Sequence, residues 1–227
     1  MVEKSLSICV VGGTGAEGSG LALRWAQAGH KVTIGSRDVS KAQSVAAELN
    51  AILGKDLVVG VDSKAGSSSA DIVVLTVPFK AQLSTVELLR DELAGKILID
   101  VTVPLVPPKV SQVQLPDHGS CVVGVQQKLG SKTRVVSAFQ NVSAHKLKDL
   151  KVEIDCDVLV AADDKEARET GISLAKDAGL RGIDVGPLAN SVVAESMTSV
   201  LIGINRKYKV PDAGIRITGV GVAQLNQ

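Results

Sequence analysis

A glycine-rich turn between a short apolar segment and a helical segment constrains this chain more than any other feature. Residues 6–11 (LSICVV) form an apolar run too short for a helix, and residues 12–18 (GGTGAEG) follow at once. A helical pattern then continues to Gly29 and His30, and a second apolar run, VTIGSR, begins at Val32. Strand, turn, helix and strand in this order predict one βαβ unit of a parallel sheet.

The turn has the spacing G-x-G-x-x-G, which binds dinucleotides when it joins a strand to a helix. We expect Gly13 to permit the tight turn, Gly15 to leave room for a pyrophosphate and Gly18 to let the helix pack close to the strand. Free amides in the first helical turn favour an anion there. A glycine-rich turn without a ligand is the alternative, and the flanking strand and helix argue against it. The predicted cofactor-binding residues of the turn are Gly13, Thr14, Gly15, Ala16, Glu17 and Gly18.

The end of the second apolar run indicates which dinucleotide is bound. An NAD site places an acidic residue about 20 residues past the glycines, whereas an arginine there accommodates the 2′-phosphate of NADP. This chain has Ser36 and Arg37 at that point, with Lys41 one helical turn later. These groups suit a dianionic phosphate, and Asp38, the one opposing charge, is expected to cap the next helix. The sequence therefore predicts NADP in preference to NAD.

Apolar runs and helical patterns alternate along the rest of the chain. Continuous apolar runs such as residues 71–78 are typical of buried parallel strands. The alternation predicts an α/β fold with a Rossmann-type doubly wound, mainly parallel sheet and extra strands. We expect two domains, an NADP-binding Rossmann-type domain over residues 1–185 and a small C-terminal helical domain over residues 186–227. After the first βαβ unit, strands are expected at residues 57–61, 71–77, 96–101, 133–139, 157–162 and 183–185.

Two loops follow strand ends and are expected to border the cleft, because ligands in a doubly wound sheet lie outside the carboxyl ends of the strands. The proline-rich segment 104–119 follows the strand at 96–101 and is expected to form the rim. Phe79 is either a wall for the nicotinamide or a contact for the helix after it. The predicted cofactor-side residues at the end of the run 71–78 are Thr76, Val77, Pro78 and Phe79.

Composition narrows the class of protein. The 227 residues carry a formal net charge of +1 and 2% aromatic residues, so neither a field for nucleic acid nor base-stacking platforms are expected. The longest apolar runs are too short to span a bilayer, and the run at 6–11 is needed as a strand rather than as a signal peptide. Cys9, Cys121 and Cys156 have no metal-ligand spacing, which favours free thiols. We expect a cytoplasmic protein that acts on a small molecule, without metal, nucleic acid or membrane.

The last helical pattern has an apolar stripe that is either core or a subunit contact. Since the stripe is long for so small a C-terminal domain, we expect a homodimer through this helix. The stripe consists of Val193, Met197, Val200, Leu201 and Ile204.

Five segments together resemble one known family. They are GGTGAEGSGLALRWAQAGH, VTIGSR with Lys41, ADIVVLTVPF, VVSAFQNVSA, and DVGPLANS leading into a helix. In this order, over nearly the whole chain, they resemble the NADPH-dependent coenzyme F420 reductases. The resemblance implies hydride exchange between NADP(H) and the C5 carbon of the deazaflavin F420, a co-substrate that lies in an apolar cleft.

The resemblance also points to residues near the two rings. It implies cleft candidates at Gln140, Asn141 and Val142 and a cofactor contact at Ala144, while no side chain is assigned a catalytic role. Direct hydride transfer needs orientation and exclusion of water more than an acid or base. Family members commonly have a histidine where this chain has Gln140, whose amide carries no charge and shuttles no proton.

Other functions fit the same residues. A reductase of another small acceptor, such as a flavin, quinone or imine, would keep the nucleotide site and change the second pocket. A non-catalytic NADP-sensing regulator would keep the nucleotide site and lose the second pocket. An open apolar cleft favours an enzyme, whereas a cleft plugged by Phe79 and Phe139 favours the regulator.

Overall fold

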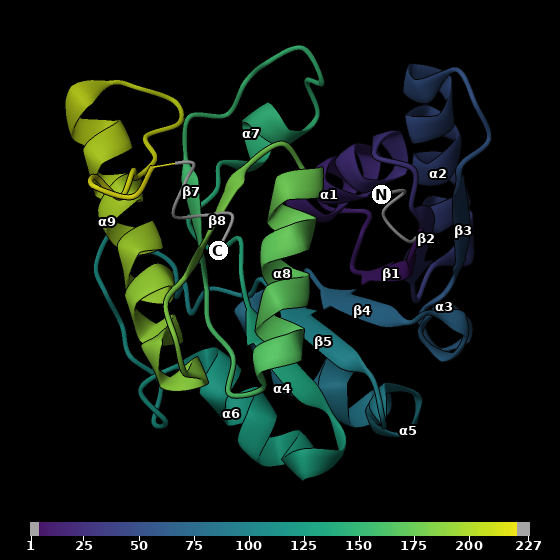
Figure 1. The fold of residues 1–227 in the computed structure, drawn as a ribbon, viewed down its shortest axis with the longest axis horizontal. Helices are drawn as coiled ribbons and strands as arrows, with labels where there is room; N and C mark the ends of the chain where they lie inside the picture. The colour runs from purple at the N-terminus through teal and green to yellow at the C-terminus, as the bar shows by residue number, and fades with distance from the viewer. Residues whose placement is uncertain (1–4, 222–227) are drawn as a thin grey trace.

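A six-stranded sheet forms the centre of the computed structural model, which describes residues 5–221 (Figure 1). All its strands are parallel, in the order β3-β2-β1-β4-β5-β6. Strand order reverses between β1 and β4, which confirms the Rossmann-type doubly wound fold. Residues 222–227 of the expected C-terminal domain lie outside the described residues. The strands are β1 (Ser7–Val11), β2 (Lys31–Ser36), β3 (Val58–Asp62), β4 (Ile72–Leu75), β5 (Ile97–Asp100) and β6 (Arg134–Ser137).

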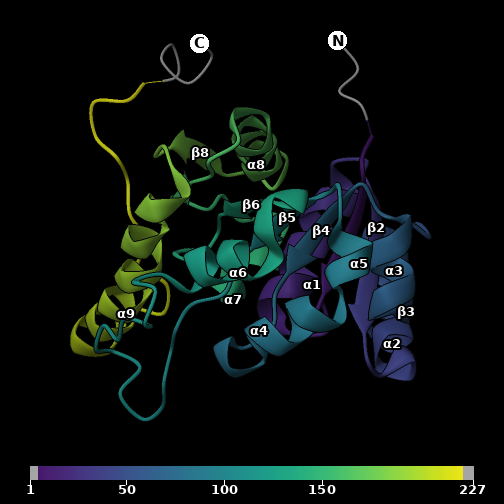
Figure 2. The same cartoon turned by 90° about the horizontal axis from the view of Figure 1, so that it is seen from below.

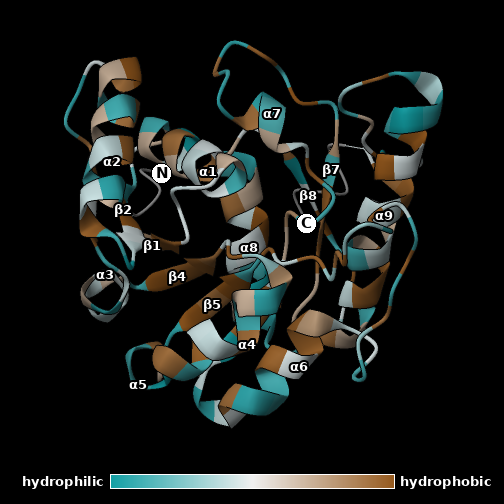
Figure 3. Cartoon of the chain, turned by 180° about the vertical axis from the view of Figure 1, so that it is seen from behind, coloured by the Kyte–Doolittle hydropathy of each residue, from teal (hydrophilic) through white to brown (hydrophobic). Residues whose placement is uncertain are grey.

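Helices cover both faces of the sheet, so its central strands are apolar throughout (Figure 3). Alternate side chains of a strand point to opposite faces. On one face, Val10 and Val74 share a core with α1 (Ala16–Gln27), α2 (Val39–Leu53) and α8 (Lys165–Asp177). On the other, Val11 and Leu75 share a core with α4 (Phe79–Leu88), α5 (Arg90–Leu93) and α6 (Cys121–Leu129). Between β3 and β4 lies α3 (Ser63–Ser69).

The extra strands form a second, small sheet. The strands β7 (Asp157–Val160) and β8 (Arg181–Asp184) pair in parallel with each other. An antiparallel bridge between Ser137 and Ala161 links this pair to the end of β6. Inside the pair, the fully buried carboxylate of Asp157 accepts two hydrogen bonds from Arg181, at 2.7 and 2.6 Å.

The C-terminal segment begins with the 3₁₀ turn η2 (Leu188–Asn190) and the long helix α9 (Ser191–Tyr208). Figures 1 and 2 both place α9 at the opposite end of the molecule from α2. The chain then returns to β7, where the amide of Ile217 donates to Asp157 at 2.6 Å. Within residues 5–221, no helix combines the length and apolar character needed to cross a membrane.

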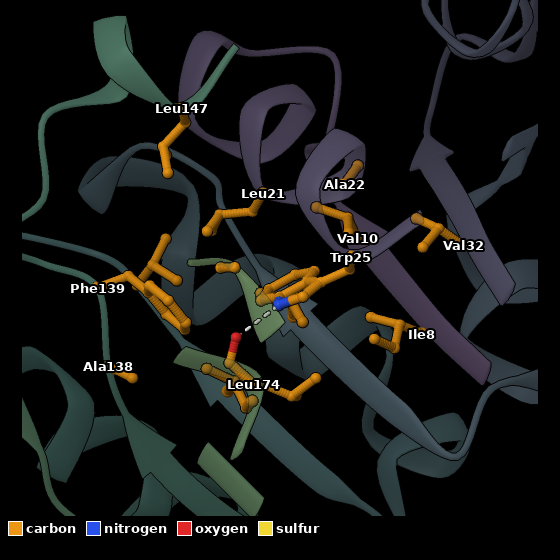
Figure 4. Close-up of a cluster of buried hydrophobic side chains, with 14 of the residues drawn as sticks. Ile8, Val10, Leu21, Ala22, Trp25, Val32, Ala138, Phe139, Leu147 and Leu174 are labelled. Carbon is orange, nitrogen blue, oxygen red and sulfur yellow. Dashed lines mark hydrogen bonds between the residues drawn. The ribbon is translucent and has the colours of Figure 1, made fainter. Parts of the chain in front are cut away.

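The end of α1 is fixed by Trp25 (Figure 4). Its ring is fully buried, and its Nε1 donates to the carbonyl of Leu174 in α8 at 2.9 Å. Phe139 packs edge-on against it, with ring centroids 5.7 Å apart at 78°. The backbone of Phe139 has φ +73°, a left-handed conformation that turns the chain after β6 and directs this ring into the core.

Arg24, the neighbour of Trp25, joins α1 to two other helices. Its guanidinium donates to the carbonyls of Leu147 at 2.9 Å and Ala178 at 3.0 Å, which end α7 (Ala144–Leu147) and α8. It also donates to the carbonyls of Lys146, Asp149 and Val152. A single buried side chain thus satisfies carbonyls that helix ends and the following loop leave unpaired.

Replacing Arg24 by methionine keeps most of the aliphatic stem and removes every donor. We expect the free energy of unfolding to fall by about 3 kcal/mol or more, because each buried acceptor left unpaired costs about 1 to 3 kcal/mol. Urea denaturation measures this change. The control is Arg90→Met, since the Arg90 side chain is 42% exposed and, within residues 5–221, its one ion pair is with the exposed Glu87 at 2.8 Å. Equal stabilities of the two variants would contradict the assigned role of Arg24.

Candidate functional site

A cavity of about 600 Å³ opens at the carboxyl ends of β1, β4 and β5, beside the reversal of strand order. This is where doubly wound sheets bind ligands. Three parts of the chain build its wall: the glycine turn and the end of β2, the loops after β4 and β5, and the segment after β6 with α9. The wall includes Gly12, Thr14 to Gly18, Ser36, Arg37, Thr76 to Phe79, Val101 to Val103, Leu105, Gln140, Val142 and Thr198.

The tight turn depends on Gly12, one position earlier than expected. Gly12 has φ +79°, and a Cβ there would lie 2.9 Å from Val77 Cγ1. The expected turn residue, Gly13, instead packs on β1, where a Cβ would lie 2.8 Å from the carbonyl oxygen of Val10. The turn is therefore held between the first strand and the loop after β4.

Gly18 brings α1 close to β4, as its place in the motif predicted. A Cβ at Gly18 would overlap the hydroxyl of Thr76. Thr76 itself donates from its amide and its Oγ1 to the carbonyl of Val11, at 2.9 and 3.0 Å. A Cβ at Gly15 would meet nothing closer than 3.6 Å, so protein packing does not require glycine there. The open space beside Gly15 faces the cavity.

The first turn of α1 supplies hydrogen-bond donors to this space. Its N-cap, Gly15, contributes no side-chain hydrogen bond, and the first amide bonded within the helix is that of Ser19, to Gly15 at 3.0 Å. The amides of residues 16–18 therefore have no carbonyl partner within the helix, as at the start of any helix. With the positive end of the helix dipole, they form an anion site.

The end of β2 presents a cation to the same cavity. Ser36 and Arg37 both lie on its wall, and Arg37 is exposed and makes no ion pair with any residue between 5 and 221. Asp38 caps α2, as expected: its carboxylate accepts from the amide of Lys41 at 3.1 Å and from Ser40 Oγ at 2.7 Å. These hydrogen bonds lower the pKa of Asp38 and engage its carboxylate at the start of α2.

The loops after β4 and β5 make the other wall mainly apolar. Val77 and Phe79 line it from the start of α4, and Val103 and Leu105 line it from the segment after β5. Of the expected rim at 104–119, Leu105 lines the cavity. Behind the wall, Asp100 accepts from Gln82 Nε2 at 2.7 Å and from the amide of Thr102 at 2.9 Å. Burial raises the pKa of Asp100 to about 6, against the effect of these donors.

Gln140 joins this wall to α9. Its side-chain Nε2 donates to the backbone carbonyl of Asp100 at 2.7 Å, and its backbone carbonyl accepts from Thr198 Oγ1 at 2.7 Å. Its Oε1 is buried and has no hydrogen-bond partner among the described residues. An unpaired buried acceptor on a cavity wall is costly unless a ligand donor pairs with it.

Glu195 attaches α9 to the wall from behind. This residue is 2% exposed, and its carboxylate accepts from Ser120 Oγ at 2.6 Å and from the amide of Cys121 at 2.8 Å. The carboxylate thus occupies the N-terminus of α6, where negative charge is stabilised. The hydroxyl groups of Ser191 and Ser120 also share a hydrogen bond, with 2.6 Å between their oxygens.

Comparison with known proteins identifies the family. The family model described as NADP oxidoreductase coenzyme F420-dependent matches residues 7–104. The F420-dependent NADP reductase of Methanocaldococcus jannaschii is 40% identical over 225 residues, covering 96% of this chain and 100% of the relative. The enzyme of the same name from Methanothermobacter thermautotrophicus is 41% identical over 222 residues, covering 95% and 96%.

This chain belongs to the F420-dependent NADP reductase family. The resemblance inferred from the sequence is thereby confirmed. Among solved structures, a putative F420-dependent NADP reductase from Arthrobacter sp. FB24 superposes with a TM-score of 0.78 at 24% identity. That superposition covers 94% of this chain and 100% of the other, and it supports the common fold.

The cavity of this F420-dependent NADP reductase family member includes most of the residues expected from sequence. Four expected residues lie off its wall. Gly13 packs on β1, Lys41 is exposed in the first turn of α2, and Ala144 begins α7. Asn141 is buried and faces β7, where its Nδ2 donates to the carbonyl of Asp157 at 2.7 Å.

Sequence reasoning missed four residues that shape the cleft in this family member: Gly12, Thr102, Thr198 and Glu195. The doubled glycine at 12 and 13 and the position of Thr102 just after a strand were signals for the first two. Thr198 and Glu195 lie on α9, which approaches the cleft only through tertiary packing. No local pattern distinguishes them from ordinary helix residues.

Proposed function

We propose that this protein transfers a hydride between NADP(H) and the deazaflavin coenzyme F420. One observation carries the proposal: a single cavity joins an anion-binding turn and a free arginine to an apolar wall. The family relatives named F420-dependent NADP reductases support the choice of substrates. Residues 1–185 would form the NADP-binding domain, and the segment from 186 would complete the cleft through Thr198.

The phosphate groups of NADP fit the polar end of the cavity. We assign the pyrophosphate to the free amides after Gly15, where a Cβ would fill the available space. We assign the 2′-phosphate to Ser36 and Arg37, with Lys41 reaching the same phosphate from the first turn of α2. A guanidinium binds phosphate oxygens in pairs, which makes Arg37 the main determinant of the preference for NADP.

The nicotinamide and the second ring fit the apolar end. The bound pair would exchange a hydride directly, and the protein's part is to hold the rings and exclude water. Thr76 to Phe79 border the nicotinamide side, and Val142 and Leu105 provide apolar surface opposite. Gln140 Oε1 is the acceptor available for a ring amide or imide N–H, a role that needs no charge.

The state of the cleft favours an enzyme over a sensing regulator. A regulator was expected to have its second pocket plugged by Phe79 and Phe139. Phe139 is instead fully buried in the core against Trp25, away from the cavity, and Phe79 is one half-buried residue of its wall. The remaining volume of about 600 Å³ is typical of a small-molecule site.

We propose that the protein is a homodimer through α9, because two apolar residues of its expected stripe are exposed. The buried face of the helix includes Ser191, Glu195 and Ser199 together with Ala194 and Leu201, so Leu201 of the stripe belongs to the core. Val193 is 51% exposed and Val200 is 45% exposed, although both belong to the apolar stripe expected from sequence. An exposed apolar stripe on a helix is typical of a subunit contact.

We also propose that the protein works in the cytoplasm. Cys9, Cys121 and Cys156 are all free and buried in the structure. Unpaired thiols are the normal state in a reducing compartment.

The proposed reaction is tested by mixing the protein with NADPH and oxidised F420 and following the absorbance of the oxidised deazaflavin. We expect this band to disappear with NADPH and to change far more slowly with NADH. Parallel reactions with a flavin, a quinone and a cyclic imine test the other acceptors. No change in the deazaflavin band anywhere between about pH 5 and 9 would remove F420 as the substrate.

Arg37→Ala is expected to weaken binding of NADP by about 1.5 to 3 kcal/mol, roughly 10- to 150-fold in Kd, because a hydrogen bond to a charged group is lost. Binding of NAD should change little. Calorimetric titration of both nucleotides measures the difference, and Glu48→Gln on the exposed face of α2 is the control. Equal weakening of NADP and NAD would show that Arg37 does not contact the 2′-phosphate.

Sedimentation at micromolar concentration is expected to give twice the mass of one chain. The double variant Val193→Asp, Val200→Asp should sediment as a monomer, since two charges would have to be buried in the contact. The matched control is Ile52→Asp, which alters a residue 56% exposed on α2. A monomeric wild type would rule out the dimer and leave the proposed reaction unaffected.

A further inference from the structure

Glu17 is the one acidic side chain on the wall of the cavity. Every other wall residue in the described part of the chain is apolar, polar without charge, or Arg37. Glu17 lies in the first turn of α1, between Gly15 and Gly18. Glu17 therefore lies beside the amides to which we assign the pyrophosphate of the dinucleotide. The assigned roles of the glycine turn use its backbone and leave this carboxyl group unexplained.

Glu17 is half-buried, and one oxygen of its carboxyl group lacks a partner. Its Oε1 is shielded from solvent and has no hydrogen bond among residues 5–221. Asp100 and Glu195, the other buried acids near the cleft, each accept at least two hydrogen bonds. Burial raises the pKa of Glu17 to about 8, with no offsetting donor or cation. Glu17 therefore carries a proton at neutral pH, even though a helix N-terminus favours a carboxylate.

We propose that Glu17 is a proton-linked determinant of dinucleotide affinity: NADP binds when this side chain is neutral, and its ionisation opposes binding. The inference rests on the proposed NADP site. A phosphate-bearing nucleotide brings several negative charges to the end of the cavity where Glu17 lies, and a carboxylate there would repel them. A neutral carboxyl group removes that repulsion and has an O–H to donate to an acceptor on the ligand.

The sign of the pH effect follows from linkage. Below about pH 8 the free protein already holds the proton, so the ionisation of Glu17 gives the affinity no pH dependence there. Above that pH, binding must recapture the proton, and the Kd rises towards tenfold per pH unit.

Three other charged or ionisable groups lie near the cleft. On β5, Asp100 has a pKa of about 6, below this range. At the end of β2, Arg37 carries a guanidinium, a group that keeps its charge in proteins. Glu195 on α9 lies behind the wall, where Ser120 Oγ and the amide of Cys121 donate hydrogen bonds to its carboxylate. The wall residues of α4 carry no ionisable group. A phosphate monoester has its second ionisation near pH 6, so the 2′-phosphate does not change above pH 7.5.

The test is calorimetric titration of NADP between pH 7.5 and 9.5 with wild type, Glu17→Gln and Glu48→Gln. We expect the Kd of wild type to rise roughly 20-fold across this range, that of Glu17→Gln to change less than about threefold, and that of Glu48→Gln to follow wild type. In two buffers of different ionisation enthalpy at pH 8.5, wild type should take up about 0.8 of a proton on binding. Glu17→Gln should take up none.

Two results would overturn the inference. One is the same pH dependence in wild type and Glu17→Gln. The other is the absence of proton uptake by wild type at pH 8.5, which needs no variant. If wild type binds NADP and reduces F420 at pH 7 while either result is found, the role of Glu17 fails and the proposed function stands. If wild type does not bind NADP at pH 7, both fail together.

Discussion

The close contact between Gly18 of α1 and Thr76 at the end of β4 is the constraint on which the cleft depends. A side chain at position 18 would overlap the Thr76 hydroxyl, and this hydroxyl is itself held by the carbonyl of Val11. The start of α1 and the ends of β1 and β4 are therefore fixed relative to one another. The free amides of α1, the end of β1 and the apolar loop after β4 meet at one point because Gly18 lets these three segments approach closely.

The far end of α1 stabilises this arrangement through polar contacts. Arg24 and Trp25 donate six hydrogen bonds to backbone carbonyls of α7, α8 and the loop after α7. A helix anchored at its C-terminal end by the core and at its N-terminal end by Gly18 can neither slide nor rotate. The amides of its first turn are thus preorganised for an anion, which reduces the cost of ordering when a ligand binds.

Three acids around the cleft differ in the hydrogen-bond donors that surround them. Glu195 accepts hydrogen bonds at the N-terminus of α6, where negative charge is stabilised. Asp100 has two donors and a pKa raised only to about 6. Glu17 has an oxygen without a partner and a pKa raised to about 8. Glu195 thus anchors α9, Asp100 supports the wall, and Glu17 is the acid that lies on the cavity wall itself.

The sequence predicted what depends on local order. The strand, turn and helix at residues 6–27, the cap at Asp38 and the continuous apolar strands all follow from periodicity or from the chemistry of one residue. The approach of α9 could not be predicted in this way. Thr198 holds the carbonyl of Gln140, 58 residues earlier, and Glu195 caps a helix that begins at Cys121. These pairings depend on tertiary packing, and helical periodicity does not encode them.

The two faces of α9 connect the cavity wall to the proposed dimer contact. Its inner face holds the cleft through Glu195 and Thr198, so the core side of this helix uses hydrogen bonds where most helices use apolar contacts. Ala194 and Leu201 are buried on the same inner face, while Val193 and Val200 on the outer face are about half exposed. Apolar surface that stays in water contributes no hydrophobic stabilisation. Covering the outer face in a dimer would supply that stabilisation, and it would hold Gln140 and Thr198 in place where the acceptor ring is proposed to bind.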